Sequence, residues 1–299
     1  SRKANHDFHP DTKNNRILKG FTNSTLQLTP KLQLTGALMV EHNDFVGTMT
    51  SPKAALVYLP VENQSLRCSI SRAYRTPSFI EEKADFSIPV STLAPPYIGQ
   101  QGDSRLKPER IVAYEIGYRG IFLDGSLRVN LETFYHNINN IIVYMEDRPN
   151  IYRYRNFTTN HVRGFEASCT WQTTEWWRLT LAYTYQKATD DYLKGLVIKN
   201  KFIMGNRFKL PWGVTANFQL YFVDDFHFEE EAWIPRSTVK DYTRFDMRIS
   251  KTFMNKRMEV AFIGQNLFDP KHYEYPPTLS AGEAYRACML EVSFRFGGD

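Results

Sequence analysis

Alternation of apolar and polar side chains at every second position is the dominant pattern in this chain. Between Arg178 and Gln186, leucines and tyrosines alternate with polar or small residues, and the segments Leu127–Tyr135 and Arg286–Phe296 repeat the pattern. A half-buried strand produces this pattern because its successive side chains point to opposite faces. It recurs at 32–40, 66–70, 112–119, 165–172, 214–222, 245–250 and 258–265. We count about thirteen such strands and no convincing helical spacing, which predicts an all-β chain.

The connections between these strands are of two kinds. Short, turn-forming ones lie at 29–31, 123–126, 210–213 and 254–256, and long polar ones at 76–106, 141–151, 187–198, 224–237 and 269–283. In chain order the two kinds alternate strictly, short then long. If each strand pairs with the next, every short turn lies at one end of the sheet and every long loop at the other. That asymmetry is typical of an antiparallel up-and-down barrel in an outer membrane.

Strand length and aromatic placement favour the same architecture. Many alternating segments exceed the roughly 5–6 residues of a typical soluble strand and approach the roughly 9–11 that a tilted membrane strand needs. Aromatic residues make up 14% of the chain. Trp176, Trp177 and Trp212 lie beside short turns, and Tyr58 and Phe122 lie at strand ends just before them. These positions predict a girdle of aromatic side chains at a membrane interface.

Charged residues fall in one phase of the alternation. The set consists of Glu115, Arg119, Arg128, Glu132, Glu166, Arg178, Asp246, Arg248, Glu291 and Arg295. A cation facing lipid near the bilayer midplane costs about 2–4 kcal/mol, so we expect this face to line a wet lumen or to meet a plug. The three cysteines, Cys68, Cys169 and Cys288, fall in the apolar phase, and we interpret them as small lipid-facing residues.

Composition and cysteine content exclude several other classes of protein. The formal net charge of +5 is spread along the chain, so no nucleic-acid surface is expected. Three scattered cysteines give neither a disulfide framework nor a zinc site. Alternating strands with polar loops also build soluble sandwiches, propellers and jelly rolls, in which strands of this length and such unequal connections are uncommon.

Four motifs in order carry a resemblance to a known family. They are Ser71–Glu82 (SRAYRTPSFIEE), Lys107–Gly120 (KPERIVAYEIGYRG), His161–Gln172 (HVRGFEASCTWQ) and Gly264–Tyr275 (GQNLFDPKHYEY). With the aromatic-ended final strand EVSFRF, they resemble the C-terminal half of TonB-dependent outer-membrane receptors. The resemblance covers residues 16–297.

The resemblance implies a 22-stranded barrel in the bacterial outer membrane, plugged by an N-terminal globular domain through which TonB acts. Such receptors take up ferric siderophores, cobalamin or other scarce ligands. About thirteen strands without a plug or coupling box suggest that residues 1–299 are the C-terminal portion of such a barrel, truncated at its N-terminus. An odd strand count agrees, because closed bacterial barrels normally have an even number. We expect a monomer in contact with outer-membrane lipid and lipopolysaccharide.

The leading functional hypothesis is therefore a receptor for energy-coupled uptake of a ferric siderophore or similar chelate. A passive porin or surface-adhesin barrel is one alternative, and a soluble carbohydrate-binding module or hydrolase is another. No GxSxG, GxxxxGK[ST] or HExxH motif occurs, so we predict no enzyme activity, no catalytic residue, no cofactor and no metal.

The long loops hold the candidate ligand-binding residues. They are Tyr97, Tyr144, Arg148, Tyr152, Arg153, Trp233, Arg236, Tyr273 and Tyr275. Aromatic surface with positive charge suits an anionic, ring-bearing chelate. The same residues could instead decorate a rim facing lipopolysaccharide. If the final strand ends at the periplasmic side, every long loop is extracellular.

Overall fold

A computed structural model describes residues 16–89, 97–189, 195–228, 237–255, 257–275 and 282–296. Within these residues the helical elements are one turn of α-helix, α1 (Phe79–Lys83), and one 3-10 turn at Pro211–Gly213. No helix in the described part of the chain is long and apolar enough to cross a membrane.

Thirteen strands form one antiparallel sheet, as the alternation predicts. In spatial order they are β1 (Ile17–Thr29), β2 (Leu32–Asn43), β3 (Gly47–Val61), β4 (Gln64–Arg75), β7 (Glu109–Phe122), β8 (Leu127–Asn139), β11 (Asn160–Gln172), β12 (Trp177–Ala188), β13 (Asn200–Leu210), β14 (Val214–Val223), β17 (Tyr242–Phe253), β18 (Met258–Gln265) and β21 (Ala287–Phe294). Each strand pairs with the next strand of this sheet along the chain, so the topology is an uninterrupted meander.

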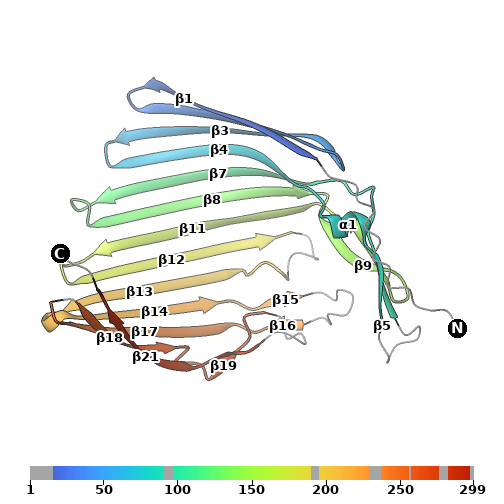
Figure 1. Cartoon of the computed structure of the whole chain (residues 1–299). Coiled ribbons are helices and arrows are strands. Elements are labelled where there is room, and N and C mark those ends of the chain that lie inside the picture. The colour runs from blue at the N-terminus through green and yellow to red at the C-terminus, as the bar shows by residue number, and fades with distance from the viewer. Residues whose placement is uncertain are drawn as a thin grey trace.

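The sheet is curved and open (Figure 1). Strands β1 and β21 form its two edges and do not pair with each other in the described residues. Every residue of β1 is exposed, and β21 is exposed apart from its first residue. The outer edge of each of these strands therefore presents backbone groups that the described sheet does not pair.

The two ends of the sheet differ, and one connection departs from the predicted alternation. Turns at 30–31, 62–63, 123–126, 173–176 and 211–213, with the connection from β17 to β18, share one end, here called the turn end, together with the end of β21. The opposite loop end carries the long connections (Figure 1). The connection from β2 to β3 also lies there, yet it has only residues 44–46 between its strands. Strict short-then-long alternation is therefore wrong at this position, where Asn43 accepts the backbone N–H of Phe45 and closes a tight turn.

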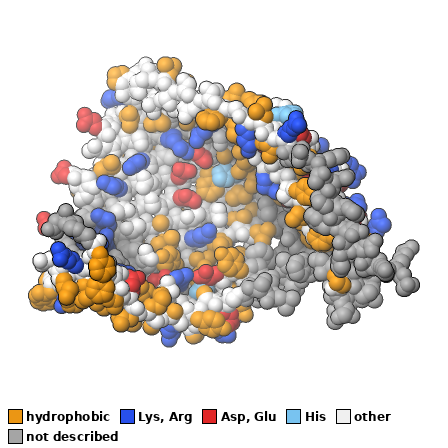
Figure 2. Space-filling view, viewed as in Figure 1, with side chains coloured by type: hydrophobic (Ala, Val, Ile, Leu, Met, Phe, Trp, Pro, Cys, Tyr) orange, Lys and Arg blue, Asp and Glu red, His pale blue; other side chains and the backbone are white. Residues whose placement is uncertain are grey.

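Cross-strand register assigns the side chains to two faces. In one row, Arg67 pairs with Gly117, Gly117 with Glu132, and Glu132 with Glu166, so these residues share a face. We call it the inner face, and Figure 2 shows it as a hollow in which acidic and basic side chains are scattered. The strand residues of the predicted charged set all lie on it.

The opposite, outer face is apolar. Cys68 pairs with Leu56 on one side and with Ile116 on the other, so it lies among aliphatic residues. Cys169 and Cys288 occupy the same face of their own strands, opposite Leu181 and Gly264. The predicted outward placement of the three cysteines is confirmed.

Aromatic side chains collect on the outer face at the turn end. The rings of Trp176, Trp177 and Phe208 stack with centroids 5.9–6.4 Å apart, and the Trp177 indole donates to Asn206 at 3.0 Å. Trp212 is 84% exposed in its turn. This arrangement matches the interfacial girdle predicted from the sequence.

The long connections contain strands that alternation did not reveal. They are β5 (Asp85–Pro89), β6 (Tyr97–Gln101), β9 (Ile142–Arg148) and β10 (Ile151–Asn156), with two small pairs, β15 (Phe226–Phe228) with β16 (Ser237–Val239) and β19 (Lys271–His272) with β20 (Ala284–Tyr285). Segments 76–106 and 141–151 are therefore not simple loops. Their strands are too short to show a clear period of two, which is why sequence periodicity missed them.

Candidate functional site

Two long connections meet in a four-stranded sheet at the loop end, ordered β5-β6-β10-β9 and here called the loop sheet. The first connection contributes β5 and β6, and the second contributes β9 and β10. They join through a parallel pairing in which Tyr152 lies opposite Gln100 and Arg153 opposite Gln101. The loop sheet thus brings together segments about fifty residues apart in sequence, and it carries most of the predicted ligand-binding residues.

Tyrosines gather on one face of the loop sheet. Tyr144 lies 4.7 Å from Tyr154 and 5.5 Å from Tyr152, measured between ring centroids. Gln100 donates to the Tyr154 hydroxyl at 2.8 Å. Burial, reinforced by the neighbouring phenols of Tyr154 and Tyr152, raises the pKa of Tyr144 to about 12. The Tyr144 phenol is therefore uncharged at physiological pH, and Glu146, opposite Tyr152, adds a carboxylate to the same aromatic face.

Arginines occupy the other face, because Arg153 and Arg155 pair with Met145 and Val143 rather than with the tyrosines. Arg155 contacts the carboxylate of Asp147 directly, while Arg153 and Arg148 lie 3.8 and 3.9 Å from it. Arg153 also donates to Gln101 at 2.6 Å. Three guanidinium groups around one carboxylate leave this face with net positive charge. The predicted aromatic and basic residues therefore share one sheet but lie on opposite faces.

An arginine clamp fixes the loop sheet to the main sheet. Arg75, the last residue of β4, donates to both Glu109 oxygens at 2.7 Å and to both Glu81 oxygens at 3.0 Å. Glu109 in turn accepts the backbone N–H of Ile142, the first residue of β9, at 2.8 Å. The clamp therefore links β4, α1, β7 and β9.

The helix α1 is stabilised by a capping box between Ser78 and Glu81. Burial alone would raise the pKa of Glu81, but hydrogen bonds from Arg75 and from Ser78 outweigh it and hold that pKa below its usual range. Glu81 is therefore ionised when it binds Arg75.

Two further contacts position the loop sheet. Asn156 accepts the backbone N–H of Lys107 at 2.7 Å and donates to the carbonyls of Lys107 and Asn140 at 2.9 and 2.7 Å. Gly102, just after β6, packs against the backbone of Glu82 so closely that a Cβ there would lie 2.4 Å from the Glu82 carbonyl carbon. Only glycine permits such a short distance between the two backbones, and this contact packs the end of β6 against α1.

The structure brings Tyr144, Arg148, Tyr152 and Arg153 together in the loop sheet. The backbone of Tyr97 lies in the same sheet, opposite Pro89. Tyr273 and Tyr275 lie apart, in the connection between β18 and β21, where Tyr275 is 67% exposed. Trp233 and Arg236 fall outside the described residues.

Sequence reasoning missed Tyr154, Arg155 and Asp147, which are central to the two faces of the loop sheet. Tyr154 and Arg155 lie in Ile151–Asn156, where tyrosine and arginine alternate over only four residues, and nothing in the sequence pattern singled out Asp147.

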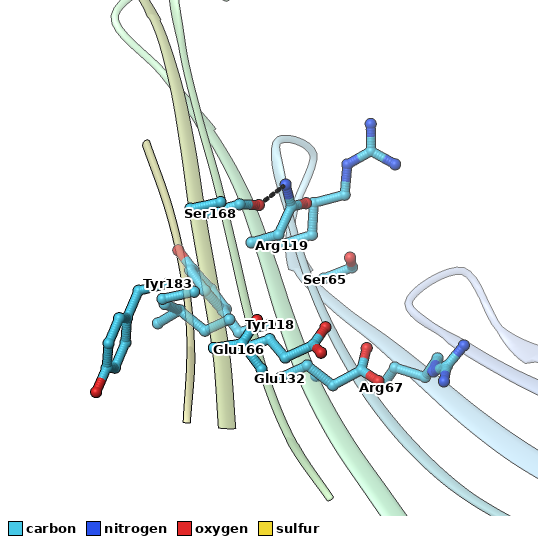
Figure 3. Close-up of a pocket in the computed structure, with 14 residues that line it drawn as sticks. Ser65, Arg67, Tyr118, Arg119, Glu132, Glu166, Ser168 and Tyr183 are labelled. Atoms are coloured by element: carbon cyan, nitrogen blue, oxygen red, sulfur yellow. Dashed lines mark hydrogen bonds between the residues drawn. The ribbon is translucent and has the colours of Figure 1, made fainter. Parts of the chain in front are cut away.

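A second polar region lies on the inner face of the main sheet. A recess of about 400 Å³ opens between β4, β7, β8, β11 and β12. In Figure 3 the carboxylates of Glu132 and Glu166 lie on the same side of this wall, and Tyr183 points away from them. These two glutamates are directly opposite each other, and their carboxylates have no hydrogen-bond or ion-pair partner within the described chain. Two facing carboxylates repel, so this wall favours a basic neighbour.

Residues 3–267 match the family described as TonB dependent receptor-like, beta-barrel. The chain belongs to this family. TonB-dependent receptors lie in the bacterial outer membrane and are transporters rather than enzymes.

Two curated relatives align over shorter stretches. The ferric enterobactin receptor of Pseudomonas aeruginosa is 32% identical over 71 residues, which are 24% of this chain and 10% of the receptor. The ferric-pyoverdine BN7/BN8 receptor of Pseudomonas putida is 28% identical over 94 residues, which are 31% of this chain and 11% of that receptor.

Solved structures share the fold over nearly the whole chain. The siderophore receptor PirA from Pseudomonas aeruginosa superposes with a TM-score of 0.70 at 17% identity, covering 93% of this chain and 48% of PirA. The ferric-catecholate import receptor Fiu from E. coli gives 0.71 at 16% identity, covering 94% of this chain and 44% of Fiu. This TonB-dependent receptor chain therefore spans just under half the length of these receptors.

Proposed function

We propose that this chain is the C-terminal portion of the barrel of an outer-membrane receptor for energy-coupled uptake of a ferric chelate. The exposed edges of β1 and β21 support it, because a barrel in lipid must pair every edge and further strands would do so. A 22-stranded barrel would need nine strands beyond the thirteen described here. In this proposal the long loops face the cell exterior and the turn end faces the periplasm.

A plugged lumen also fits the inner face better than an open pore does. The facing pair Glu132 and Glu166 forms no ion pair in the described chain, although Arg67 and Arg119 line the same recess, and basic groups of a plug domain would relieve its repulsion. TonB would then act through that plug. A porin has no plug domain, so the pair favours the receptor.

The observation that carries the ligand proposal is the arginine face of the loop sheet. Arg148, Arg153 and Arg155 surround a single carboxylate, so the face attracts anions, and charge-assisted hydrogen bonds from guanidinium groups are strong. The tyrosine face offers rings for stacking on an aromatic ligand. An anionic chelate with aromatic rings matches both faces, and the relatives named above are receptors for ferric siderophores.

The test replaces Arg148 and Arg153 together with alanine in the intact receptor. We expect affinity for ferric enterobactin, used as a trianionic catecholate probe, to fall about tenfold at low ionic strength, and its salt dependence to weaken. Arg178→Ala is the matched control, because Arg178 lies on the inner face at the turn end and should leave affinity unchanged. Unchanged affinity of the double variant at low ionic strength would assign these arginines to the rim rather than to the binding site.

A further inference from the structure

Charge is distributed very unevenly over the outer face of the main sheet. Cross-strand register places no Asp or Glu on the outer face of the thirteen described strands. It places five Lys or Arg residues there, namely Arg72, Arg110, Arg163 and Lys187 near the loop end and Lys251 near the turn end. The outer face is therefore purely cationic where it is charged, mainly at the loop end.

Arg163 of β11 and Lys187 of β12 form the most unusual part of this distribution. They are directly opposite each other across the strand pair, and both are exposed. Neither side chain has a hydrogen bond or an ion pair with any described residue. Like charges directly opposite in a sheet are destabilising, so a bound anion would stabilise this pair.

Their height along the strands places them at a membrane interface. Arg163 is eight residues from Trp171, which lies near the turn end of β11, and Lys187 is ten residues from Trp177 of the turn-end aromatic cluster. Those separations correspond to about 26 and 33 Å of strand, or about 19–25 Å of depth at the usual tilt, against an apolar band about 25 Å tall. The two cations therefore lie at the far edge of that band.

Aromatic side chains continue the surface toward the bilayer interior. Tyr135 lies opposite Arg163, and Phe165 and Tyr185 are an opposed pair one step deeper, in ring contact at 5.9 Å. The Tyr135 hydroxyl is hydrogen bonded to His161 at 2.8 Å, which orients its ring on this face. A ligand here would contact the two cations near the loop end and the three aromatic side chains on the side of the bilayer interior.

We propose that Arg163 and Lys187 bind the phosphate of a glycolipid in the membrane leaflet at the loop end. A phosphate has enough oxygens to accept hydrogen bonds from a guanidinium and an ammonium at once, and it neutralises both. The attached sugar and acyl chains would lie against Tyr135, Phe165 and Tyr185. The proposal rests on the outer-membrane location of the family and is independent of the transported ligand.

The test measures lipid binding rather than uptake, so it can fail separately from the receptor proposal. Intact receptor purified in detergent is titrated with bisphosphorylated lipid A, and bound lipid is counted by native mass spectrometry. Each cation near a membrane surface contributes an affinity factor of about five, so Arg163→Gln with Lys187→Gln should weaken binding about twentyfold to thirtyfold. Arg163→Lys should retain most of the affinity, which separates loss of charge from loss of fold.

Two controls distinguish this site from general adhesion. Lys251→Gln removes a cation from the same face at the turn end and should leave lipid A binding unchanged. Inorganic phosphate at millimolar concentration should not displace lipid A. Dephosphorylated lipid A should bind the unsubstituted protein weakly, with about the affinity of bisphosphorylated lipid A for the double variant. Undiminished binding by the double variant, an equal loss with Lys251→Gln, or full competition by inorganic phosphate would each overturn the proposal.

Discussion

The main sheet and the loop sheet are both antiparallel for most of their pairings, yet they are held in place by different interactions. In the main sheet, long ladders such as β7 with β8 run for about a dozen residue pairs, with an apolar outer face and a polar inner face. The loop sheet has strands of five to seven residues and depends on a few polar side chains, chiefly Arg75, Glu109 and Asn156.

The two regions are therefore vulnerable to different kinds of mutation. A ladder spreads its stability over many backbone hydrogen bonds, so its weak point is the lipid compatibility of the outer face. A clamp concentrates stability in one group, so loss of that group leaves several partners unsatisfied. Mutations should therefore separate the two regions cleanly.

The largest effect is expected from a charge on the outer face of the main sheet. Leu131 lies near the middle of β8 on that face, and Leu131→Arg should lower the free energy of unfolding in lipid vesicles by about 2–4 kcal/mol. Its neighbour Asn130 lies on the inner face, and Asn130→Arg should cost less than about 1 kcal/mol because it stays in water or in polar surroundings. The free energy of unfolding is measured by urea titration. An equal decrease in the two variants would show that the two faces do not differ in their exposure to lipid.

A smaller and local effect is expected from the clamp. Arg75→Ala leaves Glu81 and Glu109 without their shared cation, and both carboxylates are largely shielded, with side chains 13% and 20% exposed. Arg75 itself is 46% exposed, so we expect a local loss of about 1–2 kcal/mol, seen as faster hydrogen exchange of the Ile142 amide with main-sheet amides unaffected.

Arg105→Ala is the matched control for the clamp, because Arg105 is 81% exposed and pairs only with nearby Asp103 in the described chain. It should leave the Ile142 amide as protected as before. Slow exchange at Ile142 in the Arg75 variant would show that backbone pairing alone holds the loop sheet.

Sequence reasoning recovered the main sheet because its physical determinant is local. In Leu127–Asn139, for example, each side chain's face follows from its parity, and a one-residue slip would place Glu132 in lipid. The short connection at 44–46 escaped prediction because nothing in the alternation fixes the length of a turn.

The candidate site was only partly predictable. Tyr97, Tyr144, Arg148, Tyr152 and Arg153 were identified by residue type, but the meeting of their segments depends on the parallel pairing of β6 with β10. No local pattern encodes such a contact between distant segments. The separation of Tyr144 and Arg153 onto opposite faces also depends on the bulge between Ile151 and Tyr152.

Cysteine scanning along β8 distinguishes an outer, lipid-facing surface from an inner, polar surface. With Cys68, Cys169 and Cys288 replaced by serine, single cysteines at positions 127–135 are labelled with a small fluorophore in reconstituted receptor. Positions 127, 129, 131, 133 and 135 should be quenched by brominated lipid, and positions 128, 130, 132 and 134 should not. Quenching without a two-residue period, or strongest at the even positions, would rule out this assignment of the two faces.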